Sequence, residues 1–226
     1  AAVEEDWLYP IPPDVSAESA AAIALVGITA HLGLFRCAQL RDAERVFVSG
    51  GSGGVGSCVV QMAKATGAEV VTTASTPAKA DICRQLGADH VLSLRQRNFA
   101  KALAELGPFH VWFETSRKID FDRVVPLMTL GGRIVVMAGR EARPRFPLGP
   151  FYVHDLKLFG FAMFNAPPEE QRKCAADINR WLVRGRLKPL IDRVLPLSKA
   201  AEAHRLQEEN TLKKPGLLCG KIVLKP

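Results

Sequence analysis

Residues 45–64 read RVFVSGGSGGVGSCVVQMAK, and this stretch decides the fold of the chain. Residues 46–48 form a short apolar run of the kind found in a buried parallel strand. Gly51, Gly53 and Gly56 follow at once and match G-x-G-x-x-G, and apolar residues then recur at helical spacing as far as residue 63. A strand, a tight turn and the start of a helix in this order predict a dinucleotide-binding turn.

Each glycine of the motif has its own physical role. The first permits a sharp turn, the second lets a pyrophosphate approach the backbone, and the third lets the helix pack closely on the sheet. The N–H groups at the start of the helix then hold the anion. The alternative is a glycine-rich turn that binds nothing. The predicted cofactor-binding residues here are Gly51, Ser52, Gly53, Gly54, Val55 and Gly56.

The second predicted strand, residues 68–76, indicates which dinucleotide binds. A site for NADH usually has Asp or Glu about 20 residues beyond the glycines. This strand ends in Thr-Thr-Ala-Ser-Thr with no acid, and Lys79 lies just beyond it. Hydroxyls and a cation suit a 2′-phosphate, so we expect NADPH, bound by Ser75 and Lys79. Ser75 or Thr76 can instead cap the next helix, with Pro77 in its first turn, and both roles are compatible.

Composition narrows the class of protein. The chain has 226 residues, 48% of them hydrophobic, and a net charge of +7. Its basic residues are dispersed and do not alternate with aromatic ones, so we expect no specific nucleic-acid binding. The five cysteines are odd in number and form no C-x-x-C, which predicts neither a disulfide framework nor a metal site and favours a cytoplasmic protein. The apolar stretch 20–35 is expected to be too short and too interrupted to span a membrane.

Strands and helices alternate along most of the chain. Strands are predicted at 46–48, 68–76, 89–93, 110–115, 132–139 and 156–164. Helices are predicted at 16–26, from Thr29 onward, and at 77–86, 98–106, 119–127 and 167–183, with a loop at 140–150. The tail is predicted as strand 193–197, helix 198–208 and strand 220–224. This order predicts an α/β fold of the Rossmann type, a doubly wound parallel sheet of six strands.

Ligands of such sheets lie at the carboxyl ends of the strands. That rule places Ala138, Gly139 and Arg140 near the cofactor, and Thr115 and Ser116 as weaker candidates. Any of these can equally be an ordinary loop residue.

Four segments together resemble one family. They are Gly27-Ile-Thr-Ala-His, Ser52-Gly-Gly-Val-Gly, the strand 132–139, and Ala200-Ala-Glu-Ala-His with Gly220-Lys-Ile-Val-Leu. The chain is similar to the zinc-free quinone reductases of the medium-chain dehydrogenases, the group that includes zeta-crystallin. The resemblance covers nearly the whole chain.

The resemblance implies two domains. Residues 1–15 are expected to be the end of a GroES-like catalytic domain, with a strand-like piece at 1–13. Residues 16–190 are expected to form the NADP-binding Rossmann domain, and 191–226 to return to the catalytic domain. Most of that catalytic domain is expected to be missing from this chain.

The resemblance also implies further site residues. Thr29, Phe161, Ala162 and Met163 are expected to hold the nicotinamide end, with Ala138 and Gly139. Leu94 stands where relatives often have Tyr or His against the adenosine, and Arg95 can replace that contact and pair with the phosphate. No catalytic residue is assigned.

The implied activity is hydride transfer from NADPH to a quinone or an α,β-unsaturated carbonyl, without zinc. This chain alone is expected to be poorly active, and the alternative is a non-catalytic NADPH-binding module. The resemblance further implies a homodimer joined through the apolar edge strand 156–164.

Overall fold

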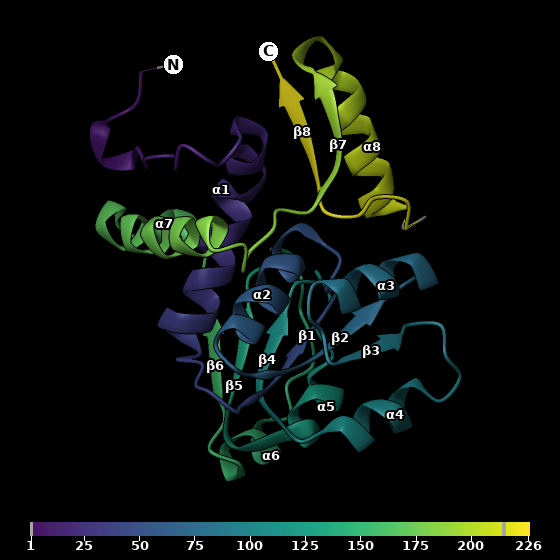
Figure 1. Cartoon of the computed structure of the whole chain (residues 1–226). Helices are drawn as coiled ribbons and strands as arrows, with labels where there is room; N and C mark the ends of the chain where they lie inside the picture. The colour runs from purple at the N-terminus through teal and green to yellow at the C-terminus, as the bar shows by residue number, and fades with distance from the viewer. Residues whose placement is uncertain (1, 214–215) are drawn as a thin grey trace.

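A six-stranded parallel sheet forms the body of the molecule (Figure 1). The computed structural model describes residues 2–213 and 216–226. The strand order is β3-β2-β1-β4-β5-β6. The strands are β1 (Arg45–Val48), β2 (Glu69–Ala74), β3 (His90–Ser93), β4 (Phe109–Glu114), β5 (Met128–Val136) and β6 (Lys157–Gly160). The order reverses between β1 and β4, which is where open α/β sheets bind ligands, so the predicted fold class is confirmed.

Helices cover both faces of this sheet. One face packs against α1 (Ala17–His31), α2 (Gly54–Ala65), α3 (Pro77–Gln85) and α7 (Pro168–Val183). The other packs against α4 (Phe99–Leu106), α5 (Phe121–Val124) and α6 (Leu148–Val153). Side chains alternate between the two cores along β1, β2, β4 and β5, as the period of two of a strand requires.

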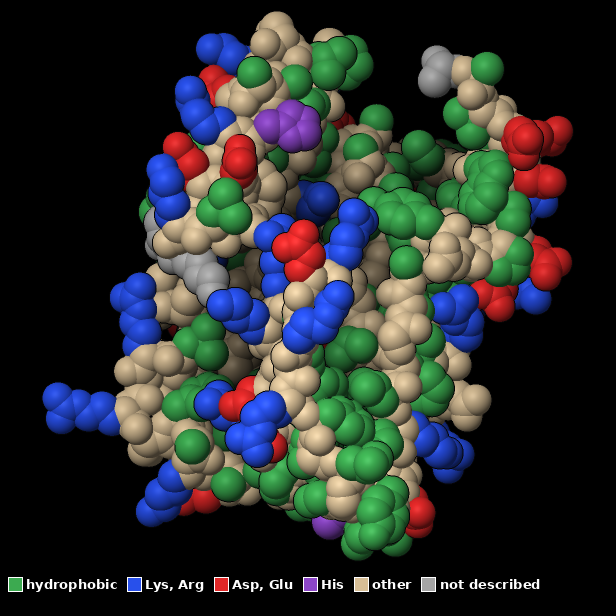
Figure 2. Space-filling view, turned by 180° about the vertical axis from the view of Figure 1, so that it is seen from behind, with side chains coloured by type: hydrophobic (Ala, Val, Ile, Leu, Met, Phe, Trp, Pro, Cys, Tyr) green, Lys and Arg blue, Asp and Glu red, His purple; other side chains and the backbone are tan. Residues whose placement is uncertain are grey.

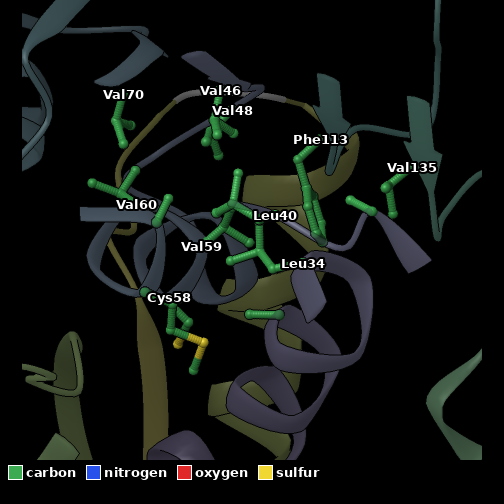
Figure 3. Packing of buried hydrophobic residues seen from close by; sticks show 14 of the residues in the cluster. Leu34, Leu40, Val46, Val48, Cys58, Val59, Val60, Val70, Phe113 and Val135 are labelled. Carbon is green, nitrogen blue, oxygen red and sulfur yellow. The ribbon is translucent and has the colours of Figure 1, made fainter. Parts of the chain in front are cut away.

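The larger core lies between the sheet and the helices α1 and α2. Figure 3 shows Phe113 and Val135 of the sheet pointing toward Leu34, with Val59 of α2 beside them. The second core contains Phe47 and Trp112, whose rings stack at 3.8 Å between centroids. The strand that carries the glycine turn is therefore held by apolar packing on both faces, which keeps the turn in place.

The tail forms a separate small lobe at the top of Figure 1. β7 (Ile191–Pro196) and β8 (Lys221–Lys225) pair in parallel, and α8 (Ala200–Leu212) connects them. Lys225 Nζ lies 2.7 Å from Glu18 Oε1 of α1, which ties the lobe to the body. The predicted strand, helix and strand of the tail are all present.

Three local predictions are wrong. The strand-like piece at 1–13 is instead a 3₁₀ turn, Glu5–Trp7, because prolines follow it and no strand lies beside it among the described residues. The second helix predicted from Thr29 is a continuation of α1, which passes into a π-helical segment, Leu32–Cys37. The strand predicted at 156–164 pairs only over Lys157–Gly160, and a 3₁₀ turn, Met163–Asn165, follows.

Smaller differences concern helix and strand boundaries. β5 begins at Met128, before its predicted start, and the predicted loop 140–150 runs into α6. Helix 119–127 is a short α5 followed by a 3₁₀ turn, Val125–Leu127. Two caps agree with the predictions: the Ser16 hydroxyl accepts from the Ser19 N–H, and Gly87 follows α3 with a φ of +100°.

The continuous helix Ala17–Cys37 corrects the expectation about the apolar stretch. At 21 residues, with a mean hydropathy of 1.6, it is long and apolar enough to cross a membrane by those two criteria. A little over half of its most apolar window, 56%, is buried inside the molecule. Core helices of globular proteins meet the same two criteria.

Candidate functional site

The glycine turn lies at the carboxyl end of β1, directly over the switch point of the sheet. A Cβ added at Gly56 would lie 2.1 Å from the Gly50 carbonyl oxygen, and one added at Gly51 would lie 2.4 Å from Thr72 Oγ1. Both distances are too short for any larger residue. The turn is further held by the Gly50 N–H, which donates to Thr73 Oγ1 at 3.0 Å. The backbone is thus fixed in a tight approach to β2.

Gly53 differs from these two glycines because it faces outward. It is exposed, and a Cβ there would meet only the Gly50 oxygen, at 3.3 Å. Gly53 is also the N-cap of α2 and makes no side-chain cap bond. The N–H groups of the first turn of α2 therefore lack a capping side chain, which suits an anion at this end of the helix.

Lys221 brings a positive charge to the same place. Its side-chain Cδ is 3.1 Å from the position of a Cβ on Gly54, and Lys221 makes no ion pair within residues 2–213 and 216–226. Gly54, Val55 and Lys221 share a cavity of about 370 Å³ with His204 and Gln207 of α8. The sequence pattern did not assign Lys221 to the site.

The tail crosses the glycine turn to bring Lys221 there. The Gly220 N–H donates to the Ser52 carbonyl oxygen at 2.9 Å, and the Cys219 thiol contacts the same oxygen at 3.5 Å. Gly216 lies beside Ser75, since a Cβ on it would be 3.2 Å from Ser75 Oγ. Residues far apart in sequence thus meet at one site, and no local pattern predicts such a contact.

The end of β2 carries the other predicted phosphate ligands. Thr76 is the N-cap of α3, with its hydroxyl accepting from the Lys79 N–H at 3.3 Å. Lys79 is half-buried and makes no ion pair among the described residues. Burial raises the pKa of the Cys219 thiol. The ammonium of Lys79 lies near that thiol and partly offsets this rise. Arg95 is exposed after β3 and lines none of the cavities described here.

A second cavity of about 320 Å³ lies on the other side of the turn. Gly50 and Thr73 contribute to it together with Leu94, Thr115 and Ser116. The Thr115 hydroxyl donates to the Ser49 carbonyl oxygen, which links the end of β4 to the end of β1. The predicted neighbours Leu94, Thr115 and Ser116 are therefore brought together.

Glu114 forms part of the wall of this cavity and was not identified from the sequence. It is 6% exposed, and its carboxylate accepts from Trp112 Nε1 at 3.1 Å and from the Ser116 N–H at 2.9 Å. Both bonds are local, so the carboxylate fixes the loop that follows β4. No sequence motif marks this role.

A cavity of about 960 Å³, larger than the other cavities described, lies at the carboxyl ends of β5 and β6. It brings together the predicted residues Ala138, Gly139, Arg140, Phe161 and Ala162. A Cβ on Gly139, whose φ is +92°, would lie 2.6 Å from the carbonyl oxygen of the residue at position 117. The loops after β4 and β5 are therefore in close contact, and glycine is required there.

Two predicted residues lie elsewhere. Thr29 is 5% exposed, and its hydroxyl donates to the Leu25 carbonyl oxygen at 2.8 Å within α1. Met163 lines a separate cavity of about 360 Å³ that also contains Trp7 and Tyr9. The structure thus groups neither residue with Ala138 and Gly139.

The buried thiols are poor nucleophiles. Burial raises the pKa of Cys58 and of Cys83 to about 12, and that of Cys174 to about 11. All three are protonated at neutral pH, so none offers a reactive thiolate. Within residues 2–213 and 216–226, no group of three or more His, Cys, Asp or Glu side chains is placed to hold a metal ion.

Comparison with known proteins bears on these features. A family model described as zinc-binding dehydrogenase matches residues 54–180. The quinone oxidoreductase of Homo sapiens is 31% identical over 224 residues, which is 96% of this chain and 65% of that protein. The trans-enoyl reductase pgmF of Aspergillus terreus is 29% identical, over 95% of this chain and 61% of its own length.

Solved structures share the fold of this chain. The quinone oxidoreductase of Thermus thermophilus, which was also solved with NADPH, aligns with a TM-score of 0.82 at 27% identity, over 96% of this chain and 69% of that one. An NAD-dependent alcohol dehydrogenase aligns with a TM-score of 0.81 at 29% identity, over 96% and 61%. The chain spans between 61% and 66% of the length of the first four curated relatives.

Proposed function

The chain belongs to the zinc-binding dehydrogenase family of the medium-chain dehydrogenases, and on that premise we propose that it binds NADPH for hydride transfer to a quinone or an α,β-unsaturated carbonyl. One observation carries the proposal. The turn at the switch point of the sheet combines glycines that no larger residue can replace with a helix N-terminus that no side chain caps. Those are the requirements of a pyrophosphate site.

The residues present fit the phosphates of a dinucleotide. The outward-facing Gly53 leaves room for the pyrophosphate, and Lys221 supplies a cation beside the N-terminus of α2. Gly51, Ser52, Gly54, Val55 and Gly56 form the rest of this cradle.

NADPH is proposed over NADH because β2 ends without a carboxylate. Ser75 and Lys79 are the proposed ligands of the 2′-phosphate, with Arg95 as a further candidate from the adjacent loop. Quinone oxidoreductases of known structure, such as that of Thermus thermophilus, have been solved with NADPH. Because the chain is also similar to an NAD-dependent alcohol dehydrogenase, NADH is the competing cofactor.

Two cavities at the carboxyl ends of the strands fit the two ends of the cofactor. We assign the adenosine to the 320 Å³ cavity that contains Leu94 and Ser116, and the nicotinamide to the 960 Å³ cavity that contains Ala138 and Phe161. Thr29 and Met163 stay candidates from the resemblance alone.

When bound, NADPH supplies a hydride from C4 of its nicotinamide. The backbone at Ala138 and Gly139 and the side chain of Phe161 would orient the ring, and the apolar side chains of Val136 and Met137 would lie beside it. The acceptor gains two electrons with the hydride, and one proton from solvent completes its reduction. We assign no proton donor among the side chains of this chain.

The organisation of the whole protein is also a proposal. We assign residues 1–15 and 191–226 to a GroES-like catalytic domain and 16–190 to the NADP-binding domain. The separate β7–β8 sheet supports this division. By resemblance we further propose that the reaction needs no zinc and that the protein is cytoplasmic, in keeping with five free cysteines.

A homodimer through β6 is proposed as well. β6 is the last strand of the sheet, and Leu158 is 40% exposed on it. Figure 2 shows hydrophobic side chains gathered at the lower right, the side of the molecule on which β6 and α6 lie. Leu148, Tyr152 and Val153 of α6 are all more than half exposed. An apolar open edge of this kind is a template for pairing with a second sheet.

The test is a comparison of Gly53→Ala with Gly149→Ala. The methyl group at Gly53 would occupy the space proposed for the pyrophosphate, whereas a methyl group at Gly149 meets nothing within 4 Å. Fluorescence titration with NADPH is expected to give a dissociation constant raised about tenfold or more by Gly53→Ala, a loss of about 1.4 kcal/mol or more. Gly149→Ala is expected to bind like the unaltered chain.

Unaltered binding by a folded Gly53→Ala variant contradicts the proposed site. If the chain binds NADPH but no quinone or enone oxidises the bound NADPH, the function that remains is the non-catalytic NADPH-binding module.

A further inference from the structure

The 960 Å³ cavity carries more positive than negative charge. Arg117, Lys118 and Arg140 line it, against one acid, Glu141. All four side chains belong to exposed residues, and none of them forms an ion pair within the described parts of the chain. In Figure 2, Lys and Arg side chains gather near the middle of the face turned to the viewer. The cavity therefore attracts anions.

The phosphates of the cofactor do not account for this charge. The glycine turn and the end of β2 contribute no residue to the lining of the 960 Å³ cavity. Lys118 also lines the 320 Å³ cavity that reaches Gly50, so it can serve the cofactor. Arg117 and Arg140 line only the larger cavity. Arg140 is already a predicted cofactor residue, so Arg117 is the cation with no assigned ligand.

The position of Arg117 is fixed by the backbone. The two loops approach closely, since a Cβ on Gly139 would lie 2.6 Å from the Arg117 carbonyl oxygen. Arg117 is thereby placed beside the predicted nicotinamide residues rather than on a separate surface. Its side chain is exposed and lines the cavity.

The other half of the cavity is apolar. Val136, Met137, Phe161 and Phe164 contribute to its lining. Aromatic and aliphatic surface of this kind suits a flat unsaturated group. The cavity therefore offers one apolar region and one cationic region to a single ligand.

We propose that the electron acceptor carries an anionic group, a phosphate, sulfonate or carboxylate, which Arg117 binds while the electron-poor double bond lies against the apolar region. This inference rests on the proposed function and names the substrate class of the same site. A guanidinium binds such oxyanions through two parallel hydrogen bonds, which gives orientation as well as attraction. A neutral acceptor gains only the apolar contacts.

The experiment compares two acceptors of similar ring structure, 1,4-naphthoquinone-2-sulfonate and the neutral 2-methyl-1,4-naphthoquinone. The first readout is the ratio of their kcat/KM values in NADPH oxidation, for the unaltered chain, Arg117→Gln and the control Arg184→Gln. Arg184 is an exposed arginine at the end of α7 and lines none of the cavities. The second readout is calorimetric binding of the sulfonate to the chain saturated with NADP⁺, which needs no turnover.

Arg117→Gln is expected to lower the kcat/KM for the sulfonate, relative to that for the neutral quinone, about tenfold. It is expected to weaken sulfonate binding by a similar factor. Arg184→Gln is expected to change neither by more than about twofold. Rising salt should reduce the advantage of the sulfonate in the unaltered chain, because the attraction is electrostatic.

Equal loss for the two acceptors, or sulfonate binding that Arg117→Gln leaves intact, overturns the inference. So does a loss of NADPH affinity in Arg117→Gln, because that outcome assigns the arginine to the cofactor. Failure of the unaltered chain to bind NADPH is a different result, and it contradicts the proposed function itself.

Discussion

Acid should destabilise this chain through His31. The imidazole lies under α7, its ring centroid 4.7 Å from that of Phe35 and 5.9 Å from that of Trp181. Burial, and then the nearby Arg180 guanidinium, lower the pKa of His31 to about 4 from a usual 6.5. The Asp177 carboxylate, 2.8 Å from Nε2, favours the charged ring, but Arg180 also pairs with that carboxylate and reduces its effect.

The sign and size follow from proton linkage. Between the two pKa values the unfolded chain binds a proton at His31 and the folded chain does not, so stability falls as the pH falls from about 6.5 toward about 4. Above about pH 6.5 the neutral His31 no longer lowers the free energy of unfolding. Between about pH 7 and about pH 5, these pKa values correspond to a loss of about 2 kcal/mol in the free energy of unfolding.

The assay is urea denaturation near pH 7 and near pH 5, for the unaltered chain and for His31→Gln. Glutamine keeps an N–H donor toward Asp177 but does not titrate. The contributions of all other titrating groups therefore cancel when the pH dependence of the variant is subtracted from that of the unaltered chain. The unaltered chain is expected to lose about 2 kcal/mol more than the variant over this interval. Equal losses, or a His31 pKa above 6.5 by NMR titration, would refute the dominance of burial over the ion pair.

Three further predictions concern the phosphate site, the dimer and the thiols. In a calorimetric titration, Lys221→Met should weaken the binding of NADPH and of NADH alike by roughly 1–3 kcal/mol, since both carry the pyrophosphate. The control Lys225→Met removes only the exposed pair with Glu18 and should leave both affinities unchanged. Leu158→Pro removes an edge-strand N–H and should give monomers by light scattering at micromolar concentration, and a monomeric unaltered chain would contradict the proposed interface. A thiol reagent near pH 8 should not label Cys58, Cys83 or Cys174 until the chain unfolds, because burial keeps these thiols protonated. Rapid labelling of any of them in the folded chain would contradict their placement.

The parts predicted correctly are those that local sequence determines. The apolar run of β1 and the glycines that follow it specify the turn without help from distant residues. The alternation of strands and helices then leaves few topologies, because parallel connections are short and right-handed. The strand-end rule put Ala138, Gly139 and Arg140 after the fifth strand, where they line one cavity, and their role in cofactor binding stays a prediction.

The parts that were wrong or missed depend on distant contacts. The break predicted between residues 26 and 29 is absent, because Gly27 lies inside α1 and packs against α7, where a Cβ on it would lie 3.1 Å from Ile178 Cδ1. The strand β6 stops at Gly160 because its only partner in the described sheet, β5, ends opposite it at Val136. Lys221 reaches the glycine turn only because β8 pairs with β7 and the tail returns over Ser52.

The central claim is that the turn at residues 51–56 and the end of β2 form a site selective for NADPH. The most direct measurement is calorimetric titration of the unaltered chain and of Lys79→Ala with NADPH and with NADH. The account predicts tighter binding of NADPH, and a loss of roughly 1–3 kcal/mol for NADPH alone in Lys79→Ala, the strength of a charge-assisted bond to the 2′-phosphate. Equal affinities for the two cofactors in the unaltered chain would contradict it.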